Sequence, residues 1–132
     1  GYWYNEYSNT FAVFINYKKE NDAIPYEDKF LSQNEIIAIS KNPRKIDSSD
    51  ADKIFRRSAK YQTTKFYLFV RKDKNDADAK EYYFLGKINS TGEPIPDKIN
   101  SNTDIFKIHY LLDTPVETNL YNYILEDIYE ID

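Results

Sequence analysis

The sequence predicts a single α+β domain, built on a curved β-sheet or a small β-barrel with two helices. The length of 132 residues suits one domain with one hydrophobic core. Roughly six segments alternate apolar and polar residues with the period of two that strands require. Two further segments repeat their apolar residues at helical spacing instead. No internal repeat or domain boundary is evident, so residues 1–132 are expected to form one unit.

The expected strands are short and have one apolar face. In the first of them Phe11, Val13 and Ile15 fall on the same side. The fourth and fifth are expected to pair as a hairpin around a polar loop at residues 73–80. The six expected strands are residues 11–17, 27–31, 36–40, 65–72, 81–89 and 105–112. Residues 90–103, with one glycine and two prolines, are expected to form a long connection of the kind that often has a functional role.

The first helix is expected to begin at Ser48 or Ser49, either of which can cap it, with Asp50 and Asp52 in its first turn. Helical spacing then places four residues on a core-facing stripe: Ala51, Ile54, Phe55 and Ser58. Four cations repeat the same spacing two residues later, about 200° around the helix: Lys53, Arg56, Arg57 and Lys60. The pattern therefore predicts a cationic outer face on this helix.

The last helix is expected to open at residues 114–117, where Pro115 suits the first turn and Thr114 with Glu117 forms a capping box. Its expected buried stripe consists of Leu120, Tyr121, Ile124, Leu125 and Ile128.

The charges are segregated along the chain. The net charge is −4, yet residues 41–72 hold ten basic and three acidic side chains. The other 100 residues hold eight basic and nineteen acidic ones. Segregation of this size concerns partners more than fold, although the folded chain can also interleave the two populations. Four cations on one helix repel one another by about 0.2–0.5 kcal/mol per pair, which favours an anionic partner or pairing with acids elsewhere.

Several classes of protein are disfavoured by composition. The absence of cysteine excludes disulfides, a cysteine zinc site and thiol chemistry, and it suits the cytoplasm. No apolar run approaches the ~20 residues of a membrane span, so no membrane partner is expected. The chain begins at Gly1 and contains no methionine, and we expect it to be part of a longer polypeptide.

A binding role is favoured over catalysis, and no cofactor is expected. His109 is the one histidine, and strand periodicity places it beside Lys107, away from the core. Three glycines provide no phosphate-binding loop, and no histidine-rich metal spacing occurs. Carboxylates are numerous, so a hydrolase that uses a carboxylate pair stays open as an alternative.

Aromatic residues are in excess, with thirteen Tyr, eight Phe and one Trp. Most suit the core, and the same holds for Tyr26 and Phe30. The segment around Asp28 nevertheless mixes aromatic rings with a carboxylate, as a pocket for a flipped base requires. Asp28 could accept a hydrogen bond from a cytosine amino group.

Four motifs in order resemble a known family: YEDKF at 26–30, SKNPR at 40–44, LFVRK at 68–72 and YFLGK at 83–87. The resemblance spans roughly residues 10–125. The family consists of C-terminal domains of unknown function in polypeptides that also contain a superfamily-2 helicase motor and often a phospholipase-D-type nuclease. SauUSI-type type IV, modification-dependent restriction enzymes are an example. One departure is Ala38, where the family tends to have Trp. Tyr61 is a candidate substitute for that ring.

The resemblance implies a non-catalytic, SRA/PUA-like target-recognition domain for double-stranded DNA. Such a domain would read a modified base of the 5-methylcytosine type by flipping it, and would guide helicase and nuclease domains of the same polypeptide. The residues expected around the base are Tyr26, Asp28, Phe30, Ser40 and Lys41. Those expected at phosphates are Arg44, Lys53, Arg56, Arg57, Lys60 and Arg71.

Two other binding roles remain open. One is a PUA-like module that binds RNA or single strands by aromatic stacking without reading a modification. The other is a protein-interaction domain that docks a nuclease or motor partner through its acidic surface.

Overall fold

The computed structural model describes residues 1–17, 28–72 and 81–126. In these ranges seven strands form one sheet with the order β1-β2-β5-β6-β7-β4-β3. The strands are β1 (Tyr2–Asn5), β2 (Thr10–Asn16), β3 (Lys29–Ser32), β4 (Glu35–Ile39), β5 (Lys65–Arg71), β6 (Tyr83–Ile99) and β7 (Thr103–Leu112). The helices are α1 (Ser49–Ile54), a 3₁₀ turn η1 (Ala59–Tyr61) and α2 (Thr118–Leu125). The expected loop 73–80 lies outside the described residues.

The sheet is mixed and open. Strands β2 and β5 run parallel, with Phe14 opposite Phe69, and the other neighbouring strands pair antiparallel. Among the described residues β1 and β3 are the two ends of the sheet and do not pair with each other. The predicted α+β class with a sheet and two helices is confirmed, whereas the closed-barrel alternative is wrong.

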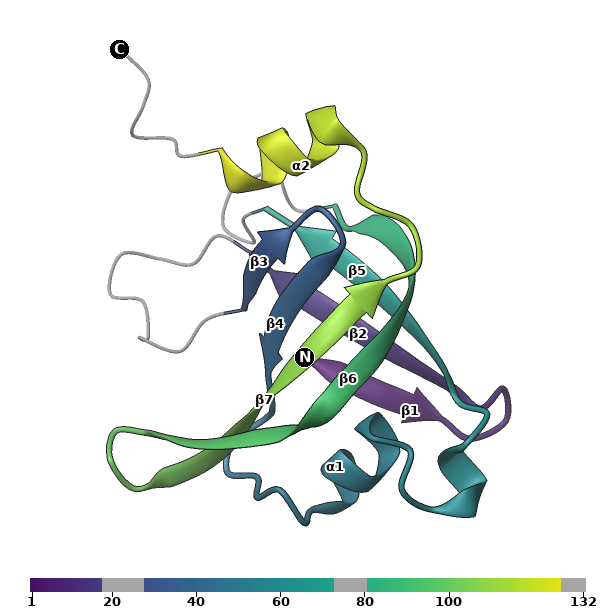
Figure 1. The fold of residues 1–132 in the computed structure, drawn as a ribbon, viewed down its shortest axis with the longest axis vertical. Coiled ribbons are helices and arrows are strands. Elements are labelled where there is room, and N and C mark those ends of the chain that lie inside the picture. Colours follow the sequence, from purple (N-terminus) through teal and green to yellow (C-terminus); the bar gives the residue numbers. More distant parts are fainter. Residues whose placement is uncertain (18–27, 73–80, 127–132) are drawn as a thin grey trace.

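The sheet curls around one core. Helix α1 lies below the curled sheet and α2 lies above it in the view of Figure 1. The alternation of β2 explains its inner face, since Phe11, Val13 and Ile15 are buried while their neighbours are partly exposed. Buried residues from all seven strands and both α-helices form a single cluster. The core thus holds the two ends of the open sheet close together.

The prediction that residues 90–103 form a long connection is wrong, because β6 continues to Ile99 and a short turn leads directly into β7. The resulting arm extends away from the rest of the sheet (Figure 1). Pro94 has no backbone N–H to donate to the neighbouring strand. It lies at a register shift between Thr91 and Ile95, where the regular hydrogen bonds of the β6–β7 ladder are interrupted. At the tip, Asn100 and Ser101 adopt positive φ angles of 53° and 67°, which allow a tight turn.

Helix α1 is shorter than its sequence pattern predicts. Ser48 caps it as expected, through a bond from the Ala51 N–H to the Ser48 hydroxyl. The helix ends at Ile54, and Arg56 then adopts a φ of 51°, in the left-handed region. The carboxylate of Asp52 accepts from both the backbone N–H and the hydroxyl of Ser58, which fixes the turn after the helix. The predicted cationic helix face is therefore wrong.

The start of α2 also differs from the prediction. Val116 N–H donates to the Gln33 carbonyl at 2.7 Å, which ties this backbone to the β3–β4 turn. Helical geometry begins only at Thr118, and Glu117 acts as the N-cap by accepting from the N–H groups of Asn119 and Leu120. Of the expected stripe, Ile124 is buried and Leu120 and Tyr121 pack against the core, while Leu125 is 37% exposed and Ile128 lies outside the described residues.

Strand β1 is an element that the periodicity does not predict. It is four residues long, and Asn5 ends it by accepting from the N–H groups of Tyr7 and Ser8. Pairing with β2 defines the strand, since Trp3 lies opposite Ala12 and Tyr4 opposite Phe11. No helix in the described ranges has the length and apolar character to cross a membrane.

Candidate functional site

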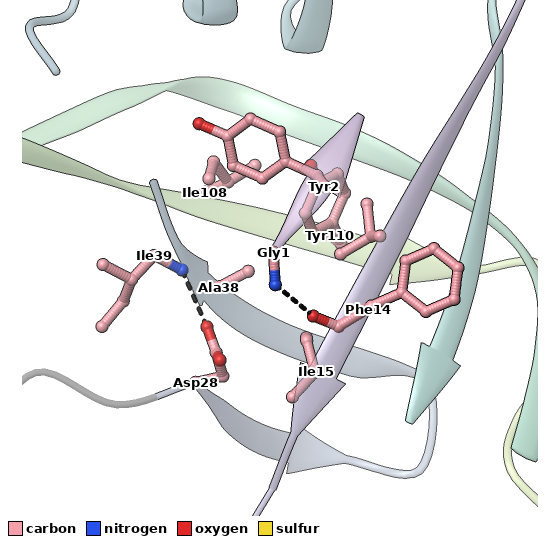
Figure 2. A pocket seen from close by; sticks show the side chains of 10 residues that line it. Gly1, Tyr2, Phe14, Ile15, Asp28, Ala38, Ile39, Ile108 and Tyr110 are labelled. Atoms are coloured by element: carbon pink, nitrogen blue, oxygen red, sulfur yellow. Dashed lines mark hydrogen bonds between the residues drawn. The ribbon is translucent and has the colours of Figure 1, made fainter. Parts of the chain in front are cut away.

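A small hollow separates the two ends of the open sheet, and we call it the seam. Strands β1 and β2 border it on one side, and Asp28 with β4 borders it on the other (Figure 2). Its lining residues are Gly1, Tyr2, Val13, Phe14, Ile15, Asp28, Ala38, Ile39, Ile108 and Tyr110. The seam is thus an apolar hollow with a few polar groups, which is the usual composition of a ligand site.

Asp28 supplies the one carboxylate among the described residues that line the seam. Its Oδ1 accepts from the Ile39 N–H at 2.9 Å, and this bond holds the side chain against the end of β4 (Figure 2). The side chain is half-buried. A carboxylate in this position can accept hydrogen bonds from an amino group that enters between the sheet ends.

Tyr2 forms the opposite wall and links the seam to α1. Its hydroxyl donates to Asp50 Oδ2 at 2.6 Å and accepts from the Lys41 N–H at 3.1 Å. Arg44 Nε also donates to Asp50 Oδ2, at 2.8 Å. Burial, reinforced by the bond to Asp50, raises the pKa of Tyr2 well above its usual value. The phenol therefore stays protonated and can act as both donor and acceptor.

The seam is small as it stands. Its cavity measures about 20 Å³, room for about one water molecule and far less than a nucleobase needs. Among the described residues no ladder joins β1 to β3, and two hydrogen bonds to tyrosine hydroxyls cross between the sheet ends. They run from Lys41 N to Tyr2 Oη at 3.1 Å and from Phe30 N to Tyr17 Oη at 3.2 Å. The hollow can therefore widen without breaking a strand pair.

The five residues expected around a base are not all at the seam. Asp28 lines it, and the Lys41 amine lies 4.8 Å over the ring of Tyr2. Phe30 is instead a core residue, 5% exposed, with its ring against Tyr17 and Tyr121. Tyr26 lies outside the described residues.

Ser40 is a structural residue rather than a pocket residue. It is buried, its hydroxyl donates to the Lys41 carbonyl at 2.8 Å, and it accepts from the Phe106 N–H at 2.9 Å. The bond from the Phe106 N–H fixes the end of β4 to β7, and the bond to the Lys41 carbonyl holds the hydroxyl in place. Ala38, which stands where the family tends to have Trp, does line the seam. Its small side chain leaves that wall without a ring.

Two of the expected phosphate-binding cations lie close to the ring of one tyrosine. The amines of Lys53 and Lys60 are 5.5 Å and 5.6 Å from the centroid of the Tyr61 ring. That ring meets Tyr4 of β1 edge-on at 5.4 Å. Lys60 is also 3.8 Å from Glu6, and both side chains are largely exposed, so this ion pair is weak. Tyr61 is therefore placed among cations and not at the seam.

Arg56 has a structural role in the fold. Its guanidinium donates to the Thr64 carbonyl and to Asn89 Oδ1, and lies 4.6 Å over the ring of Phe66. Partial burial lowers the pKa of its guanidinium without removing its charge. Arg57 turns the other way and donates to the Ile46 carbonyl at 2.6 Å. The expected phosphate role of Arg56 does not fit this placement.

Four of the expected cations thus follow β1 from end to end. Lys41 lies over the Tyr2 ring, and Arg44 binds the same Asp50 oxygen as the Tyr2 hydroxyl. Lys53 and Lys60 lie over the ring of Tyr61, which contacts Tyr4. We call these four side chains the β1 cations. Arg71 is not one of them, because it lies on the outer face of β5, with its guanidinium 4.6 Å over the ring of Tyr82.

Tyr2 and Tyr4 are the site residues that sequence reasoning misses. Tyr2 lines the seam and Tyr4 packs against Tyr61, yet neither belongs to a recognisable strand pattern. Residues 2–4 are three consecutive aromatic residues with no apolar–polar alternation, and the segment is too short to be distinguished from a loop.

His109 lies on the outer surface of β7, as the strand pattern predicts. Its Nε2 is 2.9 Å from Glu35 Oε2, and both side chains are about one-third exposed. Within the described residues no three histidine, aspartate or glutamate side chains gather as metal ligands would.

The chain was compared with known proteins. A family model described as "Domain of unknown function (DUF3427)" matches residues 1–124. No curated protein matches the chain in sequence.

Proposed function

Since the chain belongs to the DUF3427 family, a name that assigns no activity, we propose a function from the site itself. The proposed function is that of a non-catalytic DNA-binding module that reads a modified base, of the 5-methylcytosine type, extruded into the seam. The observation that carries the proposal is the position of Asp28, a carboxylate in a hollow between unpaired sheet ends that Tyr2 also lines, with the Lys41 amine over the Tyr2 ring.

The chemistry of the seam suits a cytosine. The exocyclic amino group of cytosine is a donor that acidic side chains accept, and Asp28 supplies that acceptor. A methyl group at C5 would need an apolar contact, which Val13, Ala38 and Ile108 offer. Base entry requires the seam to widen, and the open edge between β1 and β3 permits this. Extrusion itself costs a few kcal/mol of unstacking.

The β1 cations supply the second part of the proposal. Phosphate contacts position a protein on DNA, while the base contact specifies the sequence or modification. Lys41 and Arg44 lie beside Tyr2 at the seam, and Lys53 and Lys60 lie farther along β1. A duplex that follows β1 would meet these cations in turn and present one nucleotide to the seam.

The proposed place in a larger polypeptide rests on the four sequence motifs. An SRA/PUA-like recognition domain would direct helicase and nuclease domains of the same polypeptide to modified DNA. Catalysis would then belong to those domains.

The test is fluorescence anisotropy with two 20-base-pair duplexes that differ only in one 5-methylcytosine. We expect tighter binding of the methylated duplex by about 10- to 200-fold, the range for one extra methylene in an apolar pocket. Asp28→Asn should weaken binding of both duplexes at the seam, because both present the cytosine amino group that Asp28 accepts, and should leave the weaker, salt-dependent binding. Lys98→Ala is the matched control, because Lys98 pairs with Asp104 on the β6–β7 arm, away from the seam. Equal affinity of the unaltered chain for both duplexes would remove the modified-base proposal.

A further inference from the structure

The outer face of the sheet presents a row of aromatic rings that the seam does not use. Trp3 stacks on Phe14 with centroids 4.7 Å apart, and Phe14 stacks on Phe69 at 4.7 Å with planes 9° apart. Phe69 then meets Phe84 at 5.2 Å, and Phe84 meets Tyr67 at 6.0 Å. The row crosses β1, β2, β5 and β6, and we call it the aromatic row.

The register of the sheet explains why these rings line up. Phe14 lies directly opposite Phe69 in the parallel pair, and Phe69 lies directly opposite Phe84 in the antiparallel pair. A register shift beside Phe69 places Phe84 outward instead of Leu85. Aromatic pairs across strands stabilise a sheet, but they do not require exposure. Two members of the row are nevertheless well exposed, Trp3 at 60% and Phe84 at 59%.

Within the part of the chain that the structure describes, the charged side chains on the same face have one sign. Three cations point outward there, namely Lys65 and Arg71 on β5 and Lys87, which lies opposite Tyr67. No outward position of β1, of β2, of β5 or of residues 82–89 carries a carboxylate. Two acids of the described residues lie at the rim: Glu81, one residue before Tyr82, and Asp113, which accepts from Asn89. This is unusual in a chain with a net charge of −4.

We propose that the aromatic row binds single-stranded nucleic acid by base stacking. Exposed rings that accept bases, combined with cations that follow the backbone, are the means by which proteins hold single strands without reading sequence. Among the described strands β1 is an end strand, so none of them lies beyond the Trp3 ring, and a base can continue the stack of Trp3 and Phe14 there. The three outward cations would take the phosphates. This surface is separate from the seam, so the proposal goes beyond duplex recognition.

Trp3 is the single tryptophan of the chain, so its emission reports directly on this surface. The experiment titrates the 132-residue chain with dT12, with rU12 and with a twelve-nucleotide abasic strand at the same salt concentration. We expect quenching of Trp3 emission by one or both base-containing strands and none by the abasic strand. A difference between dT12 and rU12 would identify the preferred sugar.

Phe84→Ala provides the matched variant, because Phe84 is exposed, is on β6 and lies outside the seam lining. It should weaken single-strand binding by about 5- to 150-fold, the range for one stacked base. It should leave duplex binding at the seam unchanged, which separates the two proposals. Ile95→Ala, an exposed apolar residue on the β6–β7 arm, should change neither. Absence of quenching by both strands would overturn the proposal. So would a finding that Phe84→Ala disrupts a dimer without altering nucleic-acid binding, because the row would then be a contact between copies.

Discussion

The hydroxyl of Tyr2 donates to the carboxylate of Asp50 at 2.6 Å and thereby joins the end strand β1 to the first turn of α1. The two residues are 48 positions apart in sequence. Arg44 binds the same oxygen of Asp50, and Lys41 donates its backbone N–H to Tyr2. This cluster fixes one wall of the seam and holds two of the β1 cations beside it.

Tyr2→Phe should therefore lower the free energy of unfolding by roughly 1.5–3 kcal/mol, as for a hydrogen bond to a charged group. The ring would still pack against Phe11. Urea denaturation measures the change. Tyr4→Phe is the matched control, since it removes a bond to the neutral Asn9 side chain at 2.8 Å and should cost only about 0.5–1.5 kcal/mol. Equal losses in the two variants would show that the charge of Asp50 contributes nothing.

Arg56 should prove to be a stabilising residue rather than a DNA contact. Its guanidinium makes bonds to Thr64 and Asn89 and covers Phe66, a geometry that the lysine ammonium cannot reproduce. Arg56→Lys should lower the free energy of unfolding by about 1–3 kcal/mol and leave duplex affinity unchanged. Lys60→Ala should do the opposite, with a stability change under about 0.5 kcal/mol and weaker duplex binding. Thermal melts and anisotropy on both variants distinguish the two roles.

Salt dependence provides a separate measure of the β1 cations. Each phosphate contact that is removed should reduce the slope of log affinity against log salt by about 0.9. Lys53→Ala combined with Lys60→Ala should therefore reduce it by about 1.8. The preference for the methylated duplex should persist, because neither side chain lines the seam. An unchanged slope would place the DNA on another surface.

The strand pattern predicts much of the fold because burial enforces it. Phe106, Ile108 and Tyr110 are buried and Lys107 and His109 are not, as a period of two requires. The pattern fails where a tertiary contact outweighs local propensity. Residues 53–60 have helical spacing, yet the bonds from Ser58 to Asp52 and from Arg56 to Thr64 end the helix at Ile54.

The candidate site was less predictable than the fold for the same reason. Asp28 could be proposed from its aromatic neighbours in sequence, but its partner wall depends on Tyr2, which arrives through the pairing of β1 with β2. The aromatic row likewise depends on register, since Phe14, Phe69 and Phe84 are far apart in sequence and adjacent only in the folded sheet. No local pattern contains that information.

The stability of α2 should depend on pH through Glu117. Its carboxylate accepts two backbone N–H bonds at the helix N-terminus, and these bonds lower its pKa below the usual 4.5. A carboxyl group with a lowered folded pKa stabilises the fold above its unfolded pKa. This contribution is lost as the pH falls from about 4.5 through the lower, folded pKa. Glu117→Gln should be less stable than the unaltered chain at pH 6, and the difference should shrink towards pH 3. Urea titrations at both pH values measure this, and a constant difference would contradict it.

The buried amine of Lys72 should matter most when its partner is removed. The side chain is 7% exposed, lies 4.7 Å from the Tyr123 ring and pairs with Glu126 at 3.0 Å, so it ties the end of β5 to the end of α2. Glu126→Gln leaves the charge buried without its counter-ion, whereas Lys72→Met removes the charge and keeps the apolar stem. Because Glu126 is half-exposed, we expect Glu126→Gln to lower the free energy of unfolding by roughly 1–3 kcal/mol, which is less than the loss when a fully buried ion pair is broken. Lys72→Met should be closer to neutral. Urea denaturation of both variants at pH 7 shows which one loses more stability. A larger loss of stability in Lys72→Met than in Glu126→Gln would mean that the attraction within the ion pair, rather than the cost of desolvating it, determines how firmly α2 is held.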